Sequence, residues 1–84
     1  MSPAEENLKM NYLEEAEAET GKWSTSHKRN IAVQIRAYFK TYPEVARKHD
    51  NIESAVRIHD RIEIRGYPLS EDGVKAAMVD LGFA

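Results

Sequence analysis

Apolar residues recur at helical spacing near the start of the chain. Ala4, Leu8, Tyr12 and Ala16 follow one another at intervals of four residues, and Leu13 lies beside this line. Such a stripe is typical of an amphipathic helix that packs one face against a core. A capping box at residues 2–5 and a glycine at position 21 predict that this helix ends near residue 19 or 20.

A second stripe of large apolar side chains follows a short linker. The apolar residues Ile31, Ile35, Tyr38, Phe39 and Tyr42 repeat at helical spacing, and basic residues occupy the opposite face. A proline at position 43 disfavours helical geometry in the residue before it and suits the first turn of a new helix. We therefore expect one helix that follows a cap at residue 24, 25 or 26 and ends at the bend before Pro43, and a short third helix from 43 to about 49.

Residues 52–60 fit two patterns. Ile52, Ala55 and Val56 lie on one face of a helix that Asp50 and Glu53 would cap. As a strand, the same segment would form a hairpin with the residues that follow it. The helical interpretation is the favoured one, and the hairpin stays open as the alternative.

The last third of the chain predicts a strand and then a helix. Ile62 and Ile64 alternate with charged residues, so residues 61–67 are expected to be extended up to a glycine and a proline. Ser70 is the expected cap of a C-terminal helix, which Gly82 ends.

These elements predict a mostly α fold of the small α+β type, with about four short helices and one short strand or hairpin before the C-terminal helix. The 84 residues are expected to form a single small domain, with an acidic N-terminal helix over 1–21 and a compact core over 27–84. A chain of this length buries only about 60 to 65% of its unfolded surface. A thin core and an unpaired strand both favour a homo-oligomer, and we expect a homodimer.

The composition favours a cytoplasmic protein. The chain has no cysteine, and its first residues lack the basic and apolar regions of an export signal. No apolar run approaches the roughly 18 residues of a membrane span. We therefore expect no membrane association.

Charge is distributed unevenly, although the net charge is only −2. Residues 1–21 carry six glutamates and one lysine (−5), residues 22–49 carry seven basic residues and one glutamate (+6), and residues 50–84 carry seven acids and four bases (−3). The phosphate backbone of a nucleic acid would attract this basic middle segment.

Candidate chemistry is sparse. The two His-Asp dipeptides, His49-Asp50 and His59-Asp60, stand ten residues apart, and a metal site normally needs three or four ligands. No nucleophile motif or phosphate-binding glycine loop is present. We therefore predict a protein that is not an enzyme and has no catalytic residues, metal or cofactor.

Two binding functions remain. The leading hypothesis is a small non-catalytic regulatory or adaptor protein that binds a protein partner. Its expected contact residues are the apolar and aromatic side chains of the first helix and linker: Leu8, Tyr12, Leu13 and Trp23.

The alternative is a compact DNA-binding regulator, because residues 42–61 partly match a helix-turn-helix. Nucleic acid would then contact the basic side chains of this region: Lys28, Arg29, Arg36, Arg47, Lys48 and Arg57.

Overall fold

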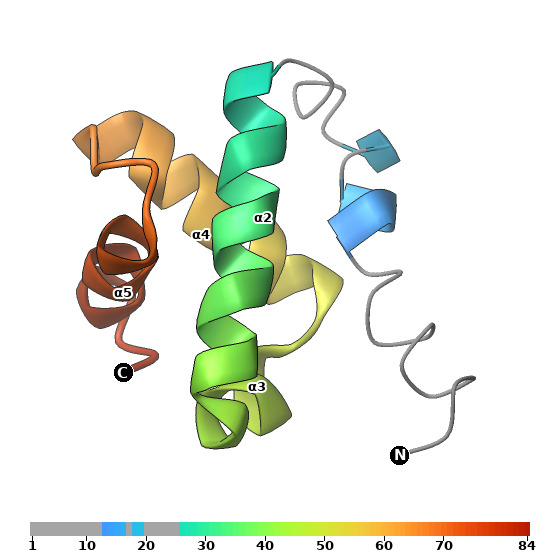
Figure 1. The fold of residues 1–84 in the computed structure, drawn as a ribbon, viewed down its shortest axis with the longest axis vertical. Helices are drawn as coiled ribbons and strands as arrows, with labels where there is room; N and C mark the ends of the chain where they lie inside the picture. Colours follow the sequence, from blue (N-terminus) through green and yellow to red (C-terminus); the bar gives the residue numbers. More distant parts are fainter. Residues whose placement is uncertain (1–12, 17, 20–25) are drawn as a thin grey trace.

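The protein is mostly helical, as its sequence predicts. The computed structural model describes residues 13–16, 18–19 and 26–84. Residues 13–16 and 18–19 are helical, and four further helices follow in the order α2 (Ser26–Thr41), α3 (Pro43–His49), α4 (Ile52–Arg65) and α5 (Glu71–Asp80). In Figure 1, α2 runs along the molecule, α4 crosses behind it, α5 lies on one side and residues 13–16 and 18–19 lie on the other.

Helices α2 and α3 form where the apolar spacing predicts them. Four residues of the predicted stripe, Ile31, Ile35, Tyr38 and Phe39, are buried along one side of α2, whereas Tyr42 is 43% exposed because the helix ends before it. Tyr42, the residue before Pro43, leaves the helical region with φ −122° and ψ 75°, and Pro43 opens α3. The proline therefore makes the bend that carries α3 around the end of α2.

Helix α4 corrects the prediction of a strand at 61–67. The helix runs without a break to Arg65, and Gly66 then adopts the left-handed conformation with φ 68° and donates its N–H to the Ile62 carbonyl. Ala55, Ile58, His59 and Ile62 share one buried helical face. Ile62 packs in the core while Ile64 points to solvent, as helical geometry requires. The described residues contain no strand or hairpin.

The N-terminus of α4 also differs from the prediction. Asn51 is the cap, not Asp50: its Oδ1 accepts the N–H of Ser54 at 2.9 Å. At α5 the predicted cap is present, because the Ser70 hydroxyl accepts the N–H of Gly73 at 3.3 Å. The capping box at 2–5 and the glycine at 21 lie outside the described residues.

One apolar cluster joins the helices. Its largest fully buried apolar side chains come from every part of the described chain except α3: Leu13, Ile31, Ile35, Ile58, Val74 and Met78. Val45 and Ala46 of α3 pack against the cluster from its edge. Among the described residues, no helix has the length and apolar content needed to cross a membrane.

Candidate partner-binding surface

The partner-contact residues predicted from the sequence fall in two places. Leu8, Tyr12 and Trp23 lie outside the described residues. Leu13 is fully buried in the apolar cluster. Its side chain therefore contributes to the core of its own chain and is not presented to a partner.

Two of the predicted nucleic-acid residues lie at the start of α2. The Lys28 Nζ is 2.6 Å from one carboxylate oxygen of Glu63 in α4, and the His27 Nε2 is 2.8 Å from the other. The hydrogen bond from Lys28, with that from His27, lowers the pKa of Glu63. Lys28 is therefore tied to α4 by a carboxylate, whereas Arg29 beside it is exposed.

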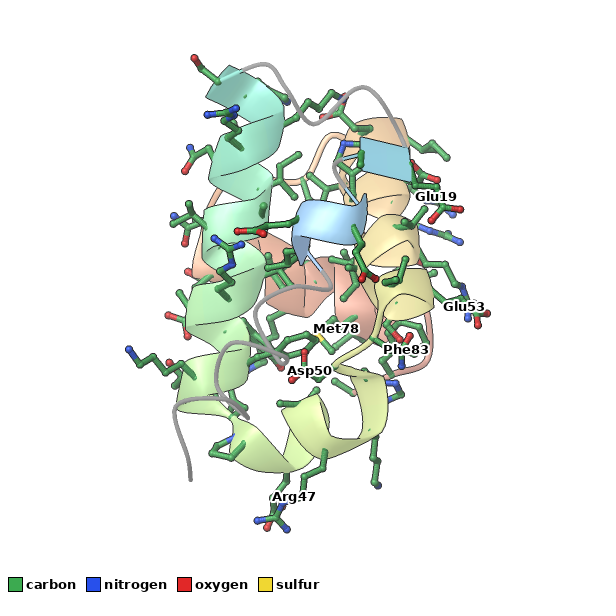
Figure 2. All side chains as sticks on the ribbon, turned by 90° about the vertical axis from the view of Figure 1, so that its right-hand side faces the viewer. Glu19, Arg47, Asp50, Glu53, Met78 and Phe83 are labelled. Atoms are coloured by element: carbon green, nitrogen blue, oxygen red, sulfur yellow. The ribbon has the colours of Figure 1, made fainter. Side chains whose placement is uncertain are left out.

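Two further basic residues lie at the opposite end of α2. Arg47 and Lys48 are exposed on α3, and Figure 2 shows Arg47 at the far end of the molecule from the start of α2. The rise of an α-helix separates residues 28 and 40 by about 18 Å along the axis. The basic segment is thus divided between two ends of α2, with the partly buried Arg36 between them.

Arg57 is held against an aromatic ring. Its guanidinium lies 5.0 Å from the centroid of Phe83, and the His49 ring stacks on Phe83 at 4.3 Å. Glu53 and Asp60 are exposed one helical turn away on either side of Arg57. The outward face of α4, which would be the recognition helix, therefore carries charges of both signs.

Of the three histidines, His59 and His49 pack against other side chains, and His27 pairs with Glu63. His59 is buried in the core, with its Nδ1 3.1 Å from Asp60 Oδ1. Burial lowers the pKa of His59, and the hydrogen bond with Asp60 opposes that shift in part. Over the described ranges, no three histidine or acidic side chains gather as metal ligands would.

A different surface emerges where the end of α4 meets α5. We define the α4–α5 face as Arg61, Ile64 and Arg65 of α4, Tyr67 of the connecting loop, and Val79 and Asp80 of α5. Asp80 is the centre of its polar part: Oδ2 accepts a hydrogen bond from the Tyr67 hydroxyl at 3.0 Å. The same oxygen lies 3.3 Å from Arg65 Nε and 3.6 Å from Arg61 Nη1.

The polar cluster fixes the loop as well as the helices. Gly66 and Tyr67 both donate their backbone N–H to the Ile62 carbonyl, at 2.8 and 3.2 Å. This cap turns the chain so that the Tyr67 ring reaches α5. The hydrogen bond to Asp80 raises the pKa of the Tyr67 hydroxyl.

Two large exposed aliphatic side chains are sequence neighbours of cluster residues, because Ile64 precedes Arg65 and Val79 precedes Asp80. Ile64 is 78% exposed and Val79 is 55% exposed. A shallow depression runs along the outer side of α5 and includes Val79. It is lined by Tyr67, Asp72, Lys75, Ala76, Val79 and Asp80. The face thus combines exposed aliphatic groups, an aromatic ring and two arginines held in place.

Sequence reasoning missed this face because it placed residues 61–67 in a strand. In a helix, the spacing of Arg61 and Arg65 puts both guanidinium groups on one side of α4. That spacing indicates a shared face only if residues 61–65 are assigned to a helix and not to a strand. Comparison of the chain with protein-family models, with curated proteins and with solved structures found no match.

Proposed function

We propose that the protein is a small non-catalytic regulatory or adaptor protein that binds a protein partner through the α4–α5 face. The observation that carries this proposal is the pair of exposed aliphatic residues, Ile64 and Val79, which directly precede Arg65 and Asp80 of the cluster in the sequence. Protein interfaces are enriched in tyrosine and arginine and exclude water from a small apolar centre. The face has this composition.

The fixed arrangement of the polar side chains on this face also supports binding. Arg61, Arg65 and Tyr67 all contact one carboxylate of Asp80. Side chains that already occupy one arrangement lose less conformational entropy when a partner binds. Surface ion pairs stabilise a fold by only about 0 to 1 kcal/mol, so the cluster matters more for positioning these groups than for stability.

The position of the basic residues favours protein over DNA as the partner. A DNA-binding surface gathers its positive charge on one side to follow the phosphate backbone. Here Lys28 faces Glu63, Arg57 lies between two acids, and Arg47 lies at the other end of α2. The DNA-binding hypothesis stays the alternative that the experiment below tests directly.

Two valines of nearly equal exposure provide a matched test. Val79 on the α4–α5 face is 55% exposed, and Val33 on the outer side of α2 is 53% exposed. Immobilised wild-type protein, Val79→Asp and Val33→Asp would each be incubated with lysate of the source cells, with and without nuclease treatment. Circular dichroism would first establish that all three proteins are equally helical.

We expect wild type and Val33→Asp to retain the same protein bands and Val79→Asp to lose them. Bands lost by both variants, or by neither, would contradict a binding role for the face. Material that disappears on nuclease treatment would favour the nucleic-acid alternative.

A further inference from the structure

The outer stripe of α5 has the form of a helix-packing seam. Asp72, Lys75, Ala76 and Val79 follow one another at the i, i+3, i+4 and i+7 positions, and all four line the shallow depression. Ala76 is small, so a second helix could approach the axis of α5 closely at this point. This spacing fits an amphipathic helix laid along the seam with apolar residues against Ala76 and Val79.

The two edges of this seam carry positive charge. Lys75 and Asp80 are five residues apart, which puts them about 140° apart around the helix and therefore on opposite edges. Lys75 borders one edge. Arg61 and Arg65 border the other, because both contact Asp80. With Asp72 and Asp80 counted, three positive and two negative charges leave a net charge of +1 along the seam.

The arginines can contact an additional acidic group. The ion pairs with Asp80 use Nη1 of Arg61 and Nε of Arg65, and a guanidinium presents five N–H donors in all. The Arg65 side chain is 57% exposed. A carboxylate above the seam would therefore meet N–H groups whose direction the contact with Asp80 already sets.

Resting on the proposed function, we propose that the α4–α5 face binds an acidic amphipathic helix of a partner protein. The aliphatic side chains of that helix pack against Ala76 and Val79. Its flanking carboxylates pair with Arg61 and Arg65 on one edge and with Lys75 on the other. The apolar contact provides affinity, and the two charged edges select acidic over neutral or basic helices.

Two synthetic peptides test the charge selection. Both are fluorescein-labelled amphipathic helices of about 18 residues with leucine at the seam positions, and they differ only in glutamate or glutamine at the flanks. Fluorescence anisotropy with the full chain would give the dissociation constant of each. We expect the glutamate peptide to bind about tenfold more tightly, an advantage that should shrink as added salt screens the charges.

Variants assign this preference to the face. The double variant Arg61→Gln, Arg65→Gln should bring the two peptides to within about twofold of each other, because the charge-assisted contacts are gone. Lys75→Gln should reduce the preference in part without altering the Asp80 cluster. Arg29→Gln is the matched control, since Arg29 is an exposed base on α2, and it should leave both affinities unchanged.

The outcomes separate this inference from the proposed function. Equal binding of the two peptides, or no binding of the glutamate peptide, would overturn the acidic helix. The proposed function would still stand if Val79→Asp loses the lysate partner and Val33→Asp does not. Self-association that Val79→Asp abolishes would make a second copy the occupant and would also overturn the inference.

Discussion

Gly73 shows how a single residue position can be fixed by the backbone of a neighbouring loop. A Cβ at this position would lie 1.7 Å from the carbonyl oxygen of Pro68 and 2.8 Å from the carbonyl carbon of the same residue. The Pro68 carbonyl also accepts the N–H of Ser70 at 2.9 Å, so it is held by the turn that caps α5. The glycine is therefore required by close approach and not by a left-handed backbone.

Gly73→Ala should destabilise the protein, although alanine is normally the better helix former by about 1 kcal/mol. The clash is with backbone, so the loop or α5 has to move, and overpacking of this kind costs about 1 to 3 kcal/mol. Urea denaturation followed by circular dichroism measures the change. An unchanged or raised urea midpoint would contradict the close approach of the Pro68 carbonyl to position 73.

His59 makes stability depend on pH. Because burial lowers its pKa below the ordinary 6.5, the folded state holds the neutral imidazole more strongly than the unfolded state does. The stabilisation is therefore complete above about pH 6.5 and is lost as the pH falls through the folded-state pKa. Asp60, Lys28 and Glu63 are the charged groups that act on this imidazole.

The variant His59→Gln should remove this dependence. We expect the wild-type urea midpoint to fall between pH 7 and pH 5.5, and to fall much less in the variant. Glu63 loses its own contribution only at lower pH, because its pKa lies below 4.5 in the folded state. A variant with the same pH dependence as wild type would mean that another group titrates in this window.

At the scale of the element, α2, α3 and α5 could be predicted from the sequence because their signals are local. These signals are the apolar stripe from Ile31 to Phe39, the proline at 43 and the serine at 70. Each of them depends on residues that are no more than about one helical turn apart. The end of α4 could not be predicted in the same way. Ile62 and Ile64 fit an alternating strand as well as a helix, and only burial of Ile62 against other helices decides between them.

The candidate surface was harder to predict than the helices. Asp80 contacts Arg61 across an interval of 19 residues, and that contact depends on how α4 and α5 are oriented. The charges and the helical spacing are visible in the sequence. Which carboxylate meets which guanidinium is set by packing that no local pattern contains.

The cap of α4 can be tested by itself. Asn51→Ala removes the acceptor for the Ser54 N–H and should lower the free energy of unfolding by about 1 kcal/mol, within the range of 0.5 to 2 kcal/mol typical of caps. Asn51→Ser keeps an oxygen acceptor and should stay within a few tenths of wild type. Equal losses in both variants, measured by urea denaturation, would show that the cap does not stabilise α4.

At the scale of the whole molecule, the distribution of charge predicts weak binding to DNA. The basic residues lie at two ends of α2, and acids lie beside several of them. A random-sequence duplex should therefore bind with a dissociation constant of about 10 to 100 µM, or more weakly, at physiological salt. Fluorescence anisotropy measures this affinity. Tight binding that Arg47→Ala with Lys48→Ala weakens would establish the alternative function.

Self-association also belongs to this scale. One sequence argument for a homodimer, an unpaired strand, falls with the helical end of α4. The thin core of a short chain without cysteine remains, so we still predict a mass above the 9.6 kDa monomer in sedimentation equilibrium at micromolar concentration. A single 9.6 kDa species over the whole concentration range would contradict this prediction.

The cluster around Asp80 has a consequence for how the sequence can change during evolution. One carboxylate oxygen serves two guanidinium groups and a hydroxyl. Loss of Asp80 alone would leave two like charges side by side, whereas loss of one arginine leaves the other ion pair intact. In homologous chains we therefore expect substitutions of Asp80 to occur together with a change at position 61 or 65, while single changes at 61 or 65 occur with Asp80 retained.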